Sequence, residues 1–422
     1  MVRKKQKKAE KELANLETIH NSFMNNLESL KTFVDSVAPI AQKHDLAARR
    51  KIERTFSQIL KILGIPKSQI GKKVPRQVKG TITREQAKQI AELSAKLPRL
   101  SLPQAQILYR SSFVMLISYF DFLISDLIRY FYRKYPESLS DKALGITLKE
   151  LSLLGGIDEA IDFVISKEAD NVLYDSLVKQ KNFFKTTLKI DTKDHIINWN
   201  SLIEATERRH IIVHNNCRVN RRYLATVNLS EIPEKAKDIK EGTLIHITEE
   251  YFRDVFDEIC ISGLILIQCC NRKWEKDETG RADEQLALDI YDALEKENWR
   301  CAERLGLFSK ECEVIDQAYR LVLDVNYCQS LKWQGKDKPM EEELKKFDIS
   351  ALSPKFRLAL CALRSDHDGF YKNVENAIIA DKLTESDFNK WPLFRELRRD
   401  NTYQEKISAI FSSLKKDSNS GG

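Results

Sequence analysis

Residues 107–132 read ILYRSSFVMLISYFDFLISDLIRYFY and form the most apolar long segment of the chain. Apolar side chains occupy nearly every face of a helix built from this sequence, so we expect a central helix over 102–133. Asp121 and Asp126 interrupt the segment, and a carboxylate in such a helix either lies on an exposed stripe or pairs with a base. The Tyr-Pro pair at 135–136 is expected to end the helix, because the residue before a proline disfavours the helical conformation.

The composition favours helices along the whole chain. Among 422 residues there are only 14 glycines and 10 prolines, whereas good helix formers such as Leu, Lys and Glu are frequent. Leu16 and Phe23 belong to a set of apolar residues that recur at three- and four-residue steps, which predicts long helices over 5–62. Gly64 and Pro66 are expected to end this run. The sequence therefore predicts an all-α fold.

The pattern also predicts a division into parts. Residues 273–283 are the clearest candidate linker, since they are mostly charged and offer little to bury. Beyond them, apolar periodic segments with breaks, one of them at Gly306, resemble tetratricopeptide-like helical hairpins in their spacing. The predicted parts are a basic N-terminal region of long helices (1–101), a central helical bundle (102–275), helical hairpins (283–415) and a disordered tail (416–422).

The charge of the chain is unevenly distributed. The formal net charge is +7, but residues 1–104 alone hold 22 Lys and Arg against 9 Asp and Glu, so that region is +13 and the remainder −6. A basic segment of this kind can bind nucleic acid by releasing counterions from phosphates. The same charges also suit the solvated face of a coiled-coil-like helix. The sequence leaves both interpretations open.

The cysteines and the apolar segments bear on the compartment. Eight cysteines are scattered without a Cys-x-x-Cys pair, and Cys269 and Cys270 lie side by side in an apolar run, as buried free thiols do. Nothing in this pattern requires an oxidising compartment. The apolar stretch 261–270 is too short to span a bilayer. We therefore expect a cytoplasmic protein without a membrane partner.

The chemistry-bearing residues gather at 208–216, which read RRHIIVHNN. An i to i+4 step rotates by about 40° on a helix, so His210 and His214 project from one face. Imidazole titrates near neutrality and can accept or donate a proton. Arg209 stays charged and presents a planar fork that suits phosphate oxygens. Such a site can promote attack of an RNA 2′-OH on the neighbouring phosphorus without a metal or another cofactor.

Two other interpretations of this stretch remain open. His210 and His214 have the spacing of a metal-binding His-x-x-x-His pair, but no third ligand has a recognisable spacing. His214 and Asn215 could instead simply end a helix, where a cationic histidine is favourable. Cys217 follows closely, and an isolated cysteine of this kind is more often structural than nucleophilic.

The segment Arg209-His210-x-x-x-His214 resembles the Arg-[Asn/His/Asp]-x-x-x-His signature of the HEPN superfamily of ribonucleases, here of the RiboL-PSP type. The surroundings are similar too, with the long apolar helix that carries SYFDF at 118–122 upstream and an apolar helix downstream. The resemblance covers roughly 102–272. It implies a helical bundle that dimerises and brings two copies of the motif into one cleft. The implied reaction is metal-independent RNA cleavage that leaves a 2′,3′-cyclic phosphate.

The resemblance assigns roles by position. It makes His214 the acid/base residue and Arg209 the cation that stabilises the transition state. Around these two, the supporting or substrate-binding residues are expected to be His210, Arg208, Asn215, Arg218, Arg221, Arg222 and Asp121.

The first hypothesis is therefore a homodimeric HEPN-type endoribonuclease with RNA as substrate, and by family analogy a toxin or antiviral-defence effector. The helical hairpins at 283–415 are expected to bind a protein partner. The second hypothesis is a scaffold without catalysis, in which the bundle binds nucleotide or RNA and the hairpins recruit proteins.

Overall fold

A computed structural model describes residues 15–65, 82–95, 97, 102–139, 147–193, 195–227, 239–348 and 352–419. The fold is all-α, as predicted. Within the described residues the only strand-like pairing is an isolated antiparallel bridge between Arg218 and Leu244. The basic segment 67–81 and the first 14 residues lie outside the described part of the chain.

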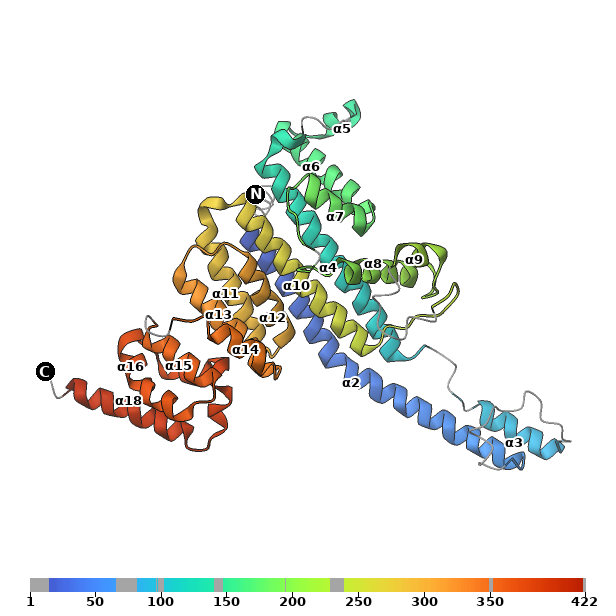
Figure 1. The fold of residues 1–422 in the computed structure, drawn as a ribbon. Coiled ribbons are helices and arrows are strands. Elements are labelled where there is room, and N and C mark those ends of the chain that lie inside the picture. Colours follow the sequence, from blue (N-terminus) through green and yellow to red (C-terminus); the bar gives the residue numbers. More distant parts are fainter. Residues whose placement is uncertain are drawn as a thin grey trace. The chain divides into compact units, whose positions relative to one another are not determined.

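Long helices dominate the first two thirds of the chain (Figure 1). Their bounds are α2 (Leu16–Ile62), α3 (Arg84–Ala95), α4 (Gln104–Lys134), α5 (Leu148–Leu153), α6 (Ile157–Tyr174), α7 (Leu177–Thr186), α8 (Trp199–His214), α9 (Arg221–Thr226) and α10 (Glu249–Trp274). Short 3₁₀ turns follow α4 and α10, at Pro136–Leu139 and Lys276–Glu278.

The C-terminal third consists of shorter helices. They are α11 (Thr279–Glu295), α12 (Trp299–Glu311), α13 (Gln317–Trp333), α14 (Asp337–Leu344), α15 (Pro354–Leu363), α16 (His367–Asp381), α17 (Glu385–Lys390) and α18 (Tyr403–Asn419), with 3₁₀ turns at Pro392–Arg395 and Leu397–Arg399. Figure 1 shows α11, α12 and α13 side by side, and each packs against the other two.

The chain divides into two compact units, each built from separate stretches of sequence. Unit 1 comprises Met1–Asn21, Phe122–Leu202 and Asp257–Gly422, and unit 2 comprises Ser22–Asp121 and Ile203–Phe256. Helices α2, α4, α8 and α10 each contribute residues to both units. The two units do not follow the domain boundaries predicted at 101 and 275. Those boundaries stay a prediction.

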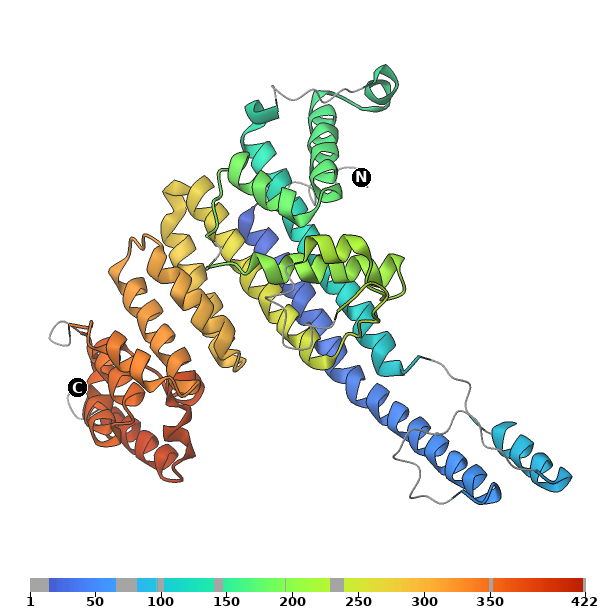
Figure 2. The ribbon, with the colours of Figure 1, turned by 45° about the vertical axis from the view of Figure 1, so that its right-hand side comes forward.

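Unit 2 contains the predicted motif. Its interior combines the apolar faces of α2 and α4 with α8, α9 and the start of α10 (Figure 2). Asp45 on α2 accepts hydrogen bonds from the backbone N–H groups of Gln104 and Ala105 at 2.8 and 2.9 Å, and so caps the start of α4. A smaller apolar cluster at the end of α8 contains Ile211, Val219, Tyr223, Val227 and Ile245.

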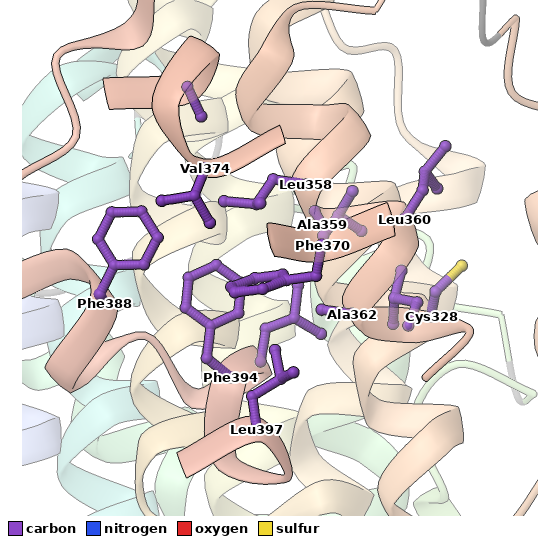
Figure 3. Close-up of a cluster of buried hydrophobic side chains, with 14 of the residues drawn as sticks. Cys328, Leu358, Ala359, Leu360, Ala362, Phe370, Val374, Phe388, Phe394 and Leu397 are labelled. Carbon is purple, nitrogen blue, oxygen red and sulfur yellow. The ribbon is translucent and has the colours of Figure 1, made fainter. Parts of the chain in front are cut away.

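Unit 1 has a hydrophobic core among its C-terminal helices. Phe370, Phe388 and Phe394 are fully buried there and pack ring against ring, with centroids 5.0 to 6.5 Å apart (Figure 3). Leu358 of α15 and Val374 of α16 pack into the same cluster. Burial of aromatic side chains on this scale is the main stabilising contribution of the hairpin region.

Two sequence expectations about breaks are wrong. The predicted linker 273–283 continues directly into α11, and Asp283 is fully buried. Its carboxylate pairs with Arg272 at 2.7 Å and accepts the backbone N–H of Ile315 at 3.0 Å, so a charged residue serves the core. Gly306 lies inside α12, where a Cβ atom would stand 2.6 Å from the ring of Tyr327. Glycine is therefore there to let two helices approach closely, and not to end one.

Helix α4 is the one described helix long and apolar enough to cross a membrane, by length and composition alone. In its most apolar 18-residue stretch, 56% is buried inside the protein, including Phe113, Leu116 and Leu127. A mostly buried core helix of a soluble protein passes the same test.

Candidate functional site

The inner face of α8 holds a buried polar cluster that we call the Glu204 cluster: Glu204, Arg208, Tyr223 and Tyr251. The Arg208 Nε donates to Glu204 Oε1 at 2.7 Å, and the side chains are only 7% exposed. The hydroxyls of Tyr223 and Tyr251 also donate to the Glu204 carboxylate. The Arg208 guanidinium lies 3.7 Å from the centre of the Tyr251 ring. Each polar group is satisfied by another, as buried polar groups require.

The Glu204 cluster fixes the place of Arg208. It was predicted as a supporting or substrate-binding residue, and its guanidinium is buried and paired with Glu204. Burial raises the pKa of the Tyr251 hydroxyl, and the Glu204 carboxylate beside it raises it further. Burial likewise raises the pKa of Tyr223. Arg208 therefore holds the inner face of α8 in the fold.

The outer face of α8 presents the two imidazoles together. The ring centroids of His210 and His214 are 4.7 Å apart with planes at 47°, as the i to i+4 spacing predicts. His214 is exposed, and His210 is half-buried. Val213 beside them is 50% exposed, so this end of α8 is an open surface. The described residues offer neither imidazole a hydrogen-bond partner that would commit it elsewhere.

Electrostatics favour the neutral form of His210. Burial lowers its pKa, and the Arg222 charge and the neighbouring His214 ring lower it further, while the Glu207 carboxylate acts in the opposite direction. A neutral imidazole at ordinary pH can accept a proton or a hydrogen bond from a ligand hydroxyl.

Arg209 is half-buried and lies close to the Asp121 carboxyl, for which the sequence had left open an exposed stripe or pairing with a base. Burial raises the pKa of the Asp121 carboxyl to about 6, and the Arg209 charge moderates this rise. Among the described residues no hydrogen bond or ion pair engages the Arg209 guanidinium, and its Nε is buried without a partner. Asp126, by contrast, lies in unit 1, where Arg129 and Arg133 are its charged neighbours.

The end of α8 is fixed by backbone geometry. Asn216 and Cys217 have positive φ angles of 46° and 62°, and the Cys217 N–H donates to the Ile211 carbonyl at 3.0 Å. The Asn215 side chain donates to the Arg218 carbonyl at 2.6 Å. This is the left-handed termination that closes many helices. Cys217 is buried, and burial raises the pKa of its thiol, so the cysteine is structural.

The predicted arginines after the motif are held in different ways. Arg222 forms two hydrogen bonds with the buried carboxylate of Glu207, each 3.2 Å long, and remains half exposed. Arg221 is 89% exposed and pairs with Glu241 at 3.2 Å. The Arg218 Nη1 donates to the Gly242 carbonyl at 3.1 Å. All three side chains line the turn after His214, but only Arg221 and Arg218 are held by weak surface contacts.

Several residues of the site were not anticipated. Glu204 and Tyr251 complete the buried cluster, and Glu207 holds Arg222. The i to i+4 spacing of Glu204 and Arg208 is a sequence signal for their ion pair. The contribution of Tyr251 has no such signal, since it arrives from a different helix.

The alternative of a metal pair requires a third ligand. The described residues contain no group of three or more His, Cys, Asp and Glu side chains placed to hold a metal ion. No model of a known protein family matches the chain, and no significant match was found among curated proteins or solved structures.

Proposed function

We propose that the protein is a metal-independent endoribonuclease of the HEPN type, with His214 as acid/base residue and Arg209 as the cation that stabilises the transition state. The observation that carries this proposal is the outer face of α8. There an exposed imidazole lies against a second one, with the ring planes tilted by 47°, near the Arg209 guanidinium, whose Nε has no hydrogen-bond partner. In a folded protein, polar groups that do not serve the fold are candidates for ligand contact.

The residues fit the chemistry of RNA transesterification. A neutral imidazole removes the proton of the 2′-OH, whose oxygen attacks the adjacent phosphorus. The bond from phosphorus to the 5′-oxygen breaks, and a protonated imidazole supplies the proton that this oxygen needs. The products are a 2′,3′-cyclic phosphate and a free 5′-hydroxyl. Arg209 offsets the added negative charge on the phosphorane, as preorganised cations do.

The reaction needs an acid and a base at once, and two copies of the chain would supply one each. Each protomer then contributes one His214 to a shared cleft. Unit 2 exposes apolar side chains that such a dimer can cover, including Ile107 at 53% and Met115 at 46% exposure. They lie eight residues apart on α4, and therefore near one face of the helix.

The proposed setting is a cytoplasmic effector, such as a toxin or an antiviral-defence protein. All eight cysteines are free, and most are buried. Free buried thiols suit a reducing compartment. The basic N-terminal region would then assist RNA capture, and the hairpins 283–415 would bind a regulating protein.

The test is cleavage of a structured RNA by the full chain in EDTA, followed on a denaturing gel. We expect cleavage by the wild type and a loss of about 10² to 10⁴-fold for His214→Ala and for Arg209→Ala. His44→Ala, which removes an exposed histidine of α2 in the same unit, is the matched control and should cut normally. The 3′ ends should resist ligation until the cyclic phosphate is opened.

Cell growth after induced expression is measured in parallel, because an enzyme that is inactive when purified can still act in cells. Growth arrest by the wild type and not by His214→Ala supports the proposal. No cleavage together with normal growth would favour the alternative, a helical scaffold that binds RNA. Light scattering checks the shared cleft, since a strict monomer at the assay concentration contradicts it.

A further inference from the structure

The second half of α2 presents a row of exposed cations. Over 43–61 the sequence holds six Lys and Arg against two Asp and Glu, so this segment has a formal net charge of +4. Four of the cations recur at steps of seven, four and seven residues: Lys43, Arg50, Arg54 and Lys61. At about 100° per residue, these steps keep all four within about 40° of one another around the helix. All four are exposed, and we call them the α2 basic stripe.

The two acidic residues of this segment do not neutralise the stripe. Asp45 caps the start of α4, and Glu53 pairs with Arg49 at 3.0 Å. Both of their charges are already counted in the net charge of +4. Within the described part of the chain, no hydrogen bond or ion pair engages a side chain of the α2 basic stripe. The four cations are therefore available to a ligand.

The opposite side of this part of α2 packs against the rest of unit 2. Ile52 and Ile59 lie about 160° to 180° around the helix from the stripe, and both are half-buried. Leu60 beside them is buried. Helix α3 lies alongside the last turns of α2 in Figures 1 and 2, and the Gln86 side chain donates to the Ile62 carbonyl at 3.0 Å. The stripe is therefore held on a regular helix and faces away from the side that packs.

The length and composition of the stripe suit the phosphate backbone of a duplex. At 1.5 Å per residue, its first and last cations lie about 27 Å apart along the helix. A row of cations on this scale neutralises phosphates and binds by releasing their counterions. Surfaces that bind single strands also use aromatic side chains on which bases stack.

The face of the stripe offers no aromatic side chain for such stacking. The residues that lie between its cations are small or polar: Ala47, Ser57 and Gln58. The bases of double-stranded RNA are already stacked inside the helix, and proteins recognise it mostly by its shape and by contacts to its phosphates and 2′-hydroxyls. The stripe therefore favours a duplex over a single strand.

We propose that the α2 basic stripe binds the backbone of double-stranded RNA without reading its sequence. This inference rests on the proposed ribonuclease function, which supplies RNA as the polyanion. It adds that α2 holds a duplex segment of the substrate. Pairing of two copies of the chain through this face is disfavoured, because it would bring like charges together.

The test measures binding and not cleavage. The full chain with His214→Ala is titrated in EDTA against a labelled RNA hairpin with a stem of about 16 base pairs, and fluorescence anisotropy is recorded. The stripe variant carries four further changes: Lys43→Gln, Arg50→Gln, Arg54→Gln and Lys61→Gln. It should bind about tenfold more weakly or worse, and the slope of log affinity against log salt should fall by about one for each cation.

A matched control removes the same charge from exposed lysines of the hairpin region. It carries Lys338→Gln, Lys345→Gln, Lys372→Gln and Lys390→Gln. This variant should bind the RNA hairpin as tightly as the parent chain. Equal losses in the two variants would overturn the proposal, because net charge and not the stripe would then govern binding. Circular dichroism confirms that each variant is folded, and Gln is a good helix former that suits α2.

The form of the ligand is tested with the same variants. An unpaired RNA strand of the same length should bind more weakly than the hairpin, and vesicles that contain phosphatidylserine should not compete with it. Stripe-dependent binding of the single strand or of the vesicles, without stripe-dependent binding of the duplex, would overturn the proposal.

Failure of this inference can be told apart from failure of the proposed function. If the wild type cuts RNA and the stripe variant binds the duplex normally, this inference alone is wrong. If the stripe governs duplex binding and the wild type cuts no RNA, the inference holds and the nuclease function alone is wrong.

Discussion

Helix α8 carries two polar regions that differ in what the fold asks of them. On its inner face, Glu204 and Arg208 are buried and bonded to two tyrosine hydroxyls. On its outer face, the His210 and His214 rings lie 4.7 Å apart, and no hydrogen bond engages either of them in the described structure. The two regions are only a few residues apart on one helix. The difference teaches that partners, and not residue types, separate structural polar groups from available ones.

The two faces of α8 should also differ in how much their side chains contribute to stability. Removing one member of a buried ion pair leaves an uncompensated charge and costs about 3 to 5 kcal/mol. Removing an exposed side chain away from such features usually changes stability by less than about 0.5 kcal/mol. Changes on the inner face of α8 should therefore lower stability, whereas changes on the outer face should lower activity and leave stability nearly unchanged.

The largest effect is expected for Arg208→Leu. It leaves the Glu204 carboxylate buried without its cation, so the free energy of unfolding should fall by about 3 to 5 kcal/mol. His214→Ala, on the same helix, should change it by less than about 0.5 kcal/mol. Urea denaturation followed by circular dichroism measures both. Similar losses in the two variants would remove the distinction between the inner and outer faces.

A smaller effect is expected for Asp121→Asn. The pKa of Asp121 is raised from 3.8 to about 6 in the folded protein. Below about pH 4 the carboxyl is neutral in both folded and unfolded chains, and above pH 6 it is ionised in both. The wild type therefore loses stability as pH rises through this window, whereas the variant does not. At pH 7 the variant should be more stable, by on the order of 2 kcal/mol.

Thermal unfolding of wild type and Asp121→Asn at pH 4, 5, 6 and 7 tests this expectation. The gap between the two melting temperatures should widen with pH and then level off. Asp45→Asn, which changes the carboxylate that caps α4, serves as a contrast. A constant gap would show that the Asp121 carboxyl is not held in its neutral form by burial.

The smallest effect concerns the outer face itself. Arg222→Gln removes a cation that lowers the pKa of His210 and frees the Glu207 carboxylate, which raises it. Both changes act in the same direction, so the pKa of His210 should rise. Arg221→Gln should leave it unchanged, because Arg221 pairs with Glu241 instead. Histidine ring proton shifts recorded against pH report the result.

Helices were predictable because their signal is local. The apolar spacing at Leu16 and Phe23 anticipated one face of α2, where both side chains are buried. The linker predicted at 273–283 was wrong because the burial of a charged residue depends on its partner in the fold. Charge was taken as a sign of exposure, but the Asp283 carboxylate is buried and pairs with Arg272.

The site was predictable in part. The proximity of the two imidazoles follows from helix geometry alone. The approach of Asp121 to Arg209 was only one of two alternatives in the sequence, because the rotation of α4 could not be known. The burial of Arg208 could not be foreseen, because Tyr223 and Tyr251 reach it from other segments of the chain. The charges of a motif can be read from sequence, but their partners depend on tertiary packing.

The close approach at Gly306 has a consequence for how this sequence can vary. A methyl group at position 306 would collide with the Tyr327 ring, so α12 and α13 can keep their separation only if the two positions change together. In natural homologues, any residue larger than glycine at 306 should be accompanied by a smaller side chain at 327. Such paired replacements would show that positions 306 and 327 do not tolerate independent substitution.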